Sequence, residues 1–193
     1  MDTSSPQVDA VSPDGQFRWD GQQWVPLPTS YRVPTSWTGP MRLAVVAYFA
    51  VGIVYGLVVT ILSVVPLVNG QVPAGVNVNE EQARTALTFA AVFAVAFTVA
   101  ISIFSAVLAV GALLGWRWAF WVTLVWLGLS SLNVVISLLS LFAGAAAVAR
   151  SPGGVWVPAI SFVIALAALG LFIWMLVAAI RYGPWAMRRP GAA

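Results

Sequence analysis

The sequence contains no cysteine, no histidine and no lysine, and only 8% of its residues are charged. The absence of cysteine excludes disulfides and thiolate chemistry. The absence of histidine removes the most common general base and metal ligand. A soluble domain carries about a quarter charged residues. With 61% hydrophobic residues and a mean hydropathy of +0.92, the 193-residue chain is unlike an ordinary water-soluble domain, and its composition fits a lipid environment.

The few charged residues leave four long apolar stretches between them. A bilayer core about 30 Å thick needs roughly 20 helical residues, and each stretch is long enough. The stretches are continuous, whereas the strands of a membrane barrel alternate polar and apolar residues. We therefore predict an all-α membrane protein, a four-transmembrane-helix bundle. The predicted spans are residues 42–67, 83–114, 118–148 and 157–181.

The arginines predict the orientation of these spans. Six arginines flank the span ends on one side of the membrane and two flank them on the other. The side that is richer in basic residues is normally cytoplasmic, so both termini are predicted to be cytoplasmic. The first group is Arg32, Arg42, Arg117, Arg181, Arg188 and Arg189, and the second is Arg84 and Arg150.

Charged residues are absent from the interior of every predicted span. Buried charges are costly in a bilayer and therefore mark ion pathways, proton relays and substrate sites. The serines have no histidine, lysine or buried carboxylate to activate them. We therefore expect no enzymatic activity, no cofactor and no metal site.

Small and hydroxyl-bearing residues are the remaining features of the spans. The first span contains a GxxxG motif at Gly52 and Gly56. Packing within the chain is the main interpretation of this motif, and homodimerisation is the alternative. The third span carries a polar stripe, whose central members are Ser130, Asn133, Ser137 and Ser140.

Asn133 is the only carboxamide in the four spans. An unpaired amide in hydrocarbon costs several kcal/mol, so we interpret the face of Asn133 as the interior of the bundle, where it forms a hydrogen bond between helices. The alternative is a polar cleft for a ligand or a lipid headgroup.

The first 40 residues differ from the rest of the chain. They hold six of the twelve prolines and four of the six acidic residues, and we predict that most of this segment is disordered. The predicted organisation is a cytoplasmic proline-rich segment (1–40), a transmembrane domain (41–185) and a short basic cytoplasmic tail (186–193).

Residues 12–26 of this segment predict a short β-hairpin. Asp20-Gly21 favours a two-residue type I′ turn, which would pair Trp19 with Gln22 and Phe17 with Trp24. An isolated hairpin is marginally stable in water. We expect the membrane interface, another copy of the chain or a protein partner to cover its aromatic face. The predicted partner-binding residues are Phe17, Trp19, Asp20, Gly21 and Trp24.

Residues 12–26 resemble the tryptophan-rich W-D-G-x-x-W module at the termini of many small membrane proteins of high-GC Gram-positive bacteria. The resemblance rests on Asp14, Gly15 and the residues from Trp19 to Trp24, about 15 of 193 positions in all. The Pro-Gly-Trp-Tyr stretch that usually opens the longer form of the module is absent. No catalytic role is established for this module family, and the resemblance implies a membrane context, that of a bacterial plasma membrane, and protein interaction.

Together these features predict a non-enzymatic integral membrane protein that acts by protein association, as a scaffold, an accessory subunit or a regulator. Its expected partners are the lipid bilayer, a membrane or cytoplasmic protein and, as an alternative, a second copy of the chain. A small transporter or channel component, with the polar stripe lining a path, and a lipid-binding membrane protein are the alternative functions. Nucleic acid is not an expected partner, because the basic residues lie at membrane boundaries.

Overall fold

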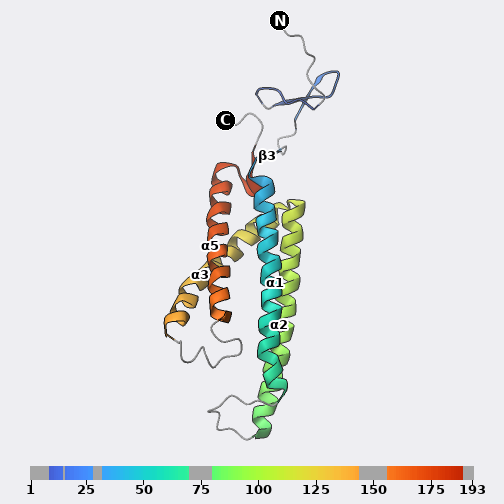
Figure 1. The fold of residues 1–193 in the computed structure, drawn as a ribbon. Helices are drawn as coiled ribbons and strands as arrows, with labels where there is room; N and C mark the ends of the chain where they lie inside the picture. Colours follow the sequence, from blue (N-terminus) through green and yellow to red (C-terminus); the bar gives the residue numbers. More distant parts are fainter. Residues whose placement is uncertain (1–8, 15, 28–31, 70–79, 144–155, 189–193) are drawn as a thin grey trace.

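The computed structural model describes residues 9–14, 16–27, 32–69, 80–143 and 156–188. Within these ranges, the chain forms four long helices, which follow one another in the sequence as α1, α2, α3 and α5 and pack together in space (Figure 1). Each contains a stretch that is long and apolar enough to cross a membrane, which confirms the predicted all-α bundle. The helices are α1 (Thr38–Val68), α2 (Glu80–Leu114), α3 (Arg117–Ala143) and α5 (Trp156–Arg181).

All four helices begin earlier than predicted, α3 and α5 by a single residue and the other two by more. α1 begins at Thr38 rather than at residue 42, and α2 begins at Glu80 rather than at residue 83. At the start of α1, the Thr35 N–H donates a hydrogen bond to the Thr38 hydroxyl at 2.9 Å, and Pro40 occupies the first turn, where a missing N–H costs little. Residues 144–148 of the predicted third span lie outside the described residues.

A tight turn joins α2 to α3. Gly115 has a positive φ of 72°, and the Trp116 N–H donates back to the Gly111 carbonyl at 2.9 Å. A left-handed glycine with this backward hydrogen bond is a common way to end a helix. The turn makes α2 and α3 antiparallel.

The helices pack as two pairs. α1 packs along α2 and α3 packs along α5, while contacts between α2 and α3 are fewer. Figure 1 shows α3 crossing α5 and diverging from α2 with distance from the shared turn. The bundle is therefore tightly joined at one end and opens toward the other.

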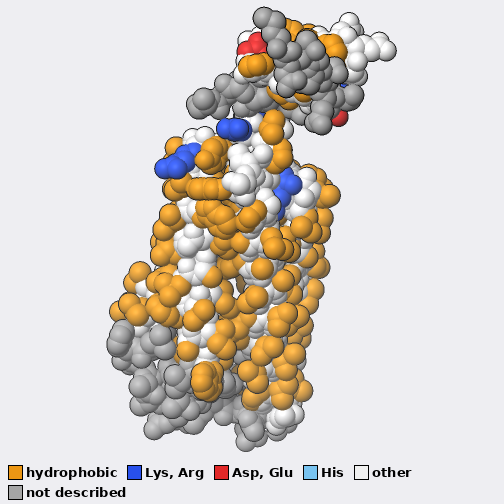
Figure 2. Space-filling model, turned by 45° about the horizontal axis from the view of Figure 1, so that its top comes forward, with side chains coloured by type: hydrophobic (Ala, Val, Ile, Leu, Met, Phe, Trp, Pro, Cys, Tyr) orange, Lys and Arg blue, Asp and Glu red, His pale blue; other side chains and the backbone are white. Residues whose placement is uncertain are grey.

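The buried core lies at the joined end. It draws on the first turns of α1 and α3 and the last turns of α2 and α5. Its largest buried side chains are Trp185, Phe49, Phe120, Met41, Leu108, Leu127 and Met175. On the face shown in Figure 2, the described surface along the helices is mainly apolar, and the described arginine side chains of the bundle lie at the joined end.

The chain after α5 folds back onto this joined end. A 3-10 turn (Pro184–Ala186) leads into β4 (Met187–Arg188), which pairs antiparallel with β3 (Val33–Pro34). Trp185 is only 1% exposed. The predicted boundaries after residues 40 and 185 therefore need correction, because residues 33–38 and 184–188 pack as part of the bundle.

Candidate functional site

The first candidate region is the N-terminal sheet, where β1 (Phe17–Trp19) pairs antiparallel with β2 (Trp24–Pro26). Trp19 lies opposite Trp24, and Phe17 lies opposite Pro26. The predicted register, with Trp19 opposite Gln22, is therefore wrong. The loop contains four residues, 20–23, instead of two.

The Asp20 side chain explains the longer loop. Its carboxylate accepts hydrogen bonds from the backbone N–H groups of Gln22 (2.8 Å) and Gln23 (2.7 Å), as aspartate commonly does in turns. Gly21 adopts a φ of 102°, a conformation that favours glycine. Two predicted partner-binding residues, Asp20 and Gly21, therefore shape the turn.

A third extended segment lies against β1. Val11 forms an antiparallel bridge with Arg18. The Asp9 N–H donates to the Trp19 carbonyl at 2.9 Å, and the Trp19 N–H donates to the Ala10 carbonyl at 2.8 Å. The predicted two-stranded hairpin is therefore part of a three-stranded arrangement, which has more internal support than an isolated hairpin.

Two carboxyl groups of this sheet are held in their charged form. The Ser12 hydroxyl and the Gln16 N–H donate to Asp14 and lower the pKa of its carboxyl group. The N–H groups of Gln23 and Gln22 lower the pKa of the Asp20 carboxyl group in the same way. Hydrogen bonds to the ionised form are the physical cause in both cases.

The sheet presents an aromatic face, as predicted. Because side chains alternate along a strand, Phe17, Trp19 and Trp24 share one side. The rings of Trp19 and Trp24 meet edge to face with centroids 5.4 Å apart, and Trp24 is 41% exposed. On the opposite side, Arg18 forms an ion pair with Asp9.

In the bundle, the two glycines of the GxxxG motif have different surroundings. A β-carbon at Gly56 would lie 4.0 Å from the Thr98 methyl carbon of α2, whereas a β-carbon at Gly52 would meet nothing within 4 Å. One turn after Gly56, the hydroxyls of Thr60 and Thr98 lie 2.7 Å apart. Packing within the chain therefore accounts for Gly56 but not for Gly52.

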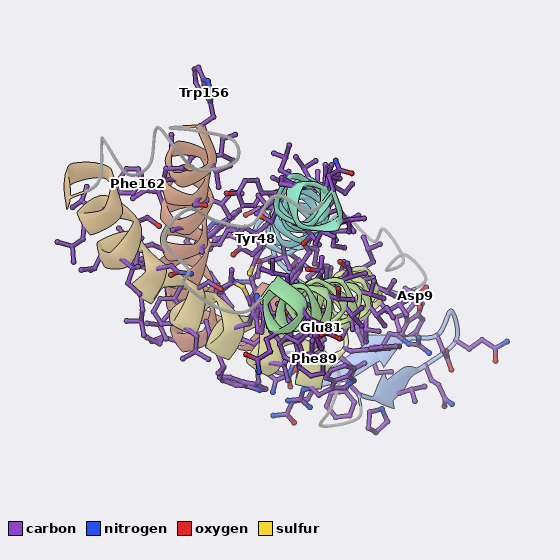
Figure 3. All side chains as sticks on the ribbon, turned by 90° about the horizontal axis from the view of Figure 1, so that it is seen from below. Asp9, Tyr48, Glu81, Phe89, Trp156 and Phe162 are labelled. Carbon is purple, nitrogen blue, oxygen red and sulfur yellow. The ribbon has the colours of Figure 1, made fainter. Side chains whose placement is uncertain are left out.

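The polar stripe of α3 does not face one common interior. Ser137 is buried, and Ser130 forms a hydrogen bond with Tyr48 of α1, which lies on the inner side of α1 in Figure 3. Asn133 is exposed. The interpretation of the Asn133 face as the bundle interior is wrong for Asn133 itself, because its side chain lies on a part of the α3 surface that the other described helices do not cover. The Ser140 side chain lies outside the described residues.

Two tyrosines that the sequence analysis did not single out, Tyr48 and Tyr55, form hydrogen bonds between helices. The Tyr55 hydroxyl of α1 donates to the Val157 carbonyl of α5 at 2.8 Å and also contacts the Ser161 hydroxyl. A phenol within an apolar span needs a partner for its polar end. That requirement is the signal by which Tyr48 and Tyr55 are recognisable in the sequence.

The second candidate region is the arginine end of the bundle. The Arg42 guanidinium lies 5.9 Å from the Trp185 ring centroid and packs so closely on Gly115 that a β-carbon there would clash. The Trp185 indole N–H donates to the Trp116 carbonyl at 2.8 Å. Residues from α1, from the turn between α2 and α3 and from the C-terminal segment therefore meet at one point, which sequence reasoning missed.

Arg42 has no carboxylate partner here. The sequence contains no acidic residue between Asp20 and Glu80 or after Glu81. Within the part of the chain that the structure describes, Arg42 Nε is buried without a hydrogen-bond partner. Its charge lies at the C-terminal end of α2, where the helix dipole favours a cation by about 0.3–1 kcal/mol.

An open apolar groove lies along α3 close to this end. Its volume is about 310 Å³. On one side the Trp126 ring packs against Phe104 of α2 with centroids 5.4 Å apart. The groove is lined by Trp121, Val122, Val125, Trp126 and Leu129.

Comparison of the chain with protein-family models, curated proteins and solved structures gave no match. Its function is therefore inferred from its own geometry, chiefly the aromatic face of the sheet and the arginine end of the bundle.

Proposed function

We propose that this protein is a non-enzymatic integral membrane protein that acts by protein association through the aromatic face of its N-terminal sheet. The observation that carries the proposal is the edge-to-face pair of Trp19 and Trp24, with Trp24 41% exposed on an ordered sheet. Tryptophan is enriched in the residues that dominate binding energy at protein interfaces. A scaffold, an accessory subunit or a regulator would use such a surface.

Order in the sheet before binding favours this role. The Asp20 carboxylate holds the turn, and the Ser12 hydroxyl accepts a hydrogen bond from the Phe17 N–H at 2.9 Å. A surface that is already ordered loses less conformational entropy when a partner binds. The hydrogen bonds of the sheet therefore support tight association through a small aromatic area.

We propose a bacterial plasma membrane as the location, with both termini in the cytoplasm. Arg117 and Arg181 lie at the same end of the bundle as β3 and β4. The positive-inside rule places an arginine-rich end on the cytoplasmic side. The aromatic face of the sheet would then be available to membrane and cytoplasmic proteins.

The transport alternative has less support. Its proposed path requires the polar residues of α3 to share one lumen, but they have different environments. Ser130 bonds to α1, Ser137 is buried and Asn133 is exposed.

Photo-crosslinking in cells tests the proposed association. A photoreactive residue at position 16, next to β1, is combined with Trp19→Ala and Trp24→Ala in the full chain. Truncating two such residues typically removes at least 2 kcal/mol of binding free energy, a loss of about 30-fold or more in affinity. The expected result is loss of the crosslinked species seen with the unmodified aromatic face.

The matched control for this experiment is a double variant in the exposed loop, Gln22→Ala with Gln23→Ala. Only backbone atoms of these residues bond to Asp20, so the turn is retained and crosslinking should persist. Identical crosslinked species in the control and the tryptophan variant would refute the proposal. A crosslinked species of twice the chain mass would identify a second copy as the partner.

A further inference from the structure

Cationic and apolar features adjoin each other along α3. Arg117 begins α3 and lies four residues before Trp121, so the two side chains are neighbours on the helix surface. Arg42 lies at the same end of the bundle, where its guanidinium packs against Gly115. The groove begins at Trp121 and continues to Leu129. The exposed guanidinium of Arg117 therefore lies next to the start of an apolar groove.

The length of this arrangement matches one leaflet of a bilayer. At 1.5 Å per residue, α3 covers about 18 Å between Arg117 and Leu129, slightly more than half of a bilayer core about 30 Å thick. Trp116, Trp118 and Trp121 are exposed at the cationic end, as tryptophans are at the level of lipid headgroups. The cations therefore lie at headgroup depth and the groove at acyl-chain depth.

The positive charge at this end of the bundle would be stabilised by an anion from outside the chain. No acidic residue lies in the sequence near Arg42, Arg117 or the C-terminal segment. Arginine is suited to phosphate because its planar guanidinium offers several N–H donors.

We propose that the arginine end of α3 binds one anionic phospholipid of the surrounding leaflet. Arg117 binds the phosphate of its headgroup, Arg42 adds positive charge at the same end of the bundle, and an acyl chain lies in the groove from Trp121 to Leu129. Basic pockets between membrane helices bind anionic lipids by this combination of charge and burial. The site is independent of the aromatic face of the sheet.

The charge balance favours an anionic lipid over a zwitterionic one. A zwitterionic headgroup brings its own cation beside the phosphate, so two nearby guanidinium groups gain less from it. The groove favours a lipid over free phosphate, because inorganic phosphate leaves its apolar lining uncovered. The preference for an anionic over a zwitterionic lipid and the preference for a lipid over free phosphate can both be measured.

Lipid binding by the full chain in mild detergent tests the proposal. Native mass spectrometry measures the binding of phosphatidylglycerol and phosphatidylcholine with identical acyl chains. The expected result is preferential binding of phosphatidylglycerol. Arg117→Gln should weaken that binding about fivefold, which corresponds to about 1 kcal/mol for one arginine near a membrane surface.

A second variant, with a matched control, tests whether the groove takes part in lipid binding. Val125→Trp fills the groove and should weaken the binding of phosphatidylglycerol, whereas Val163→Trp on α5 should not. Val125 and Val163 are almost equally exposed, at 62% and 63%. The control for Arg117→Gln is Arg181→Gln, because Arg181 is an exposed arginine at the end of α5.

Three results would overturn the proposal. One is equal affinity for the two lipids, and another is an equal effect of Arg117→Gln and Arg181→Gln, which would mean that only net charge attracts the lipid. The third is displacement of phosphatidylglycerol by inorganic phosphate together with no effect of Val125→Trp, which would indicate a site for the free anion. Arg117 is exposed, so its replacement leaves the packing of Arg42 and Trp185 intact.

Discussion

At the scale of single residues, Trp185 has the most unusual conformation in the described chain. Its φ of 58° and the φ of 53° at Ala186 lie in the left-handed region, which costs a bulky residue about 1–3 kcal/mol. Burial of the indole and its hydrogen bond to the Trp116 carbonyl offset this cost. The hydroxyls of Thr35 and Thr38 both donate to the Ala186 carbonyl, which ties the turn to the start of α1.

Replacement of Trp185 by alanine should strongly destabilise the bundle. Removing a buried tryptophan typically costs about 3–5 kcal/mol, and here the joined end also loses a hydrogen bond. The measurement is thermal unfolding of the full chain in detergent. Trp156→Ala is the control, because Trp156 is 76% exposed and projects away from the bundle in Figure 3. Equal melting temperatures for the two variants would contradict the anchoring role of Trp185.

At the scale of elements, the N-terminal sheet is stabilised by polar contacts that sequence patterns only partly reveal. The motif from Trp19 to Trp24 indicated a turn and an aromatic face, and both are present. The register was not predictable from Asp20-Gly21, because the two hydrogen bonds accepted by the Asp20 carboxylate favour a wider loop. The contribution of residues 9–12 depends largely on backbone hydrogen bonds. Almost any residue type can form such bonds, so no sequence pattern predicts them.

The sheet should lose stability in acid. The pKa values of Asp14 and Asp20 are lowered in the folded chain, so their ionised forms stabilise the sheet fully above the ordinary value near 3.8. This stabilisation is lost as the pH falls below that value through the lowered pKa values. The amide proton shifts of Gln22 and Gln23, measured by NMR between pH 6 and pH 2, report the change.

Asp20→Asn separates charge from shape in this titration. The asparagine oxygen still accepts hydrogen bonds from the N–H groups of Gln22 and Gln23 but does not titrate in this range. The variant should therefore retain the turn and lose the part of the pH dependence that belongs to Asp20. An unchanged titration of the two amides would show that another group is responsible.

At the scale of the whole molecule, the packing of the helices decides which polar residues are buried. Ser137 is buried while Asn133, one turn earlier, is exposed. Both belong to the same polar stripe, so periodicity predicted one face for both. The neighbours of each side chain in the folded bundle separate them.

The different burial of Asn133 and Ser137 predicts opposite effects for two leucine substitutions. Asn133→Leu should leave the melting temperature in detergent unchanged or raise it slightly, because the side chain is exposed to an apolar environment. Ser137→Leu should destabilise the bundle by about 1–3 kcal/mol, the usual cost of overpacking a buried position. Thermal unfolding of both variants is the measurement, and a large loss for Asn133→Leu would mean that Asn133 lies inside the bundle.

The sequence by itself determined the number of helices, their approximate ends and the aromatic face of the N-terminal sheet. These properties depend on local composition and periodicity, because about 20 consecutive apolar residues are enough to specify a membrane helix and alternation places strand side chains on a face. Glycines such as Gly115 also mark turns through their own backbone preference.

Only the tertiary structure decided the pairing of α1 with α2 and α3 with α5, the exposure of Asn133 and the insertion of Trp185 among the helix ends. Nearly every position in these helices is apolar, so composition does not distinguish a side chain that faces lipid from one that faces another helix. The choice depends on shape and on a few hydrogen bonds between residues far apart in the chain, such as those of Tyr55 and Trp185. The scarcity of charge that makes the spans easy to recognise also leaves the sequence with few signals for how the helices pack.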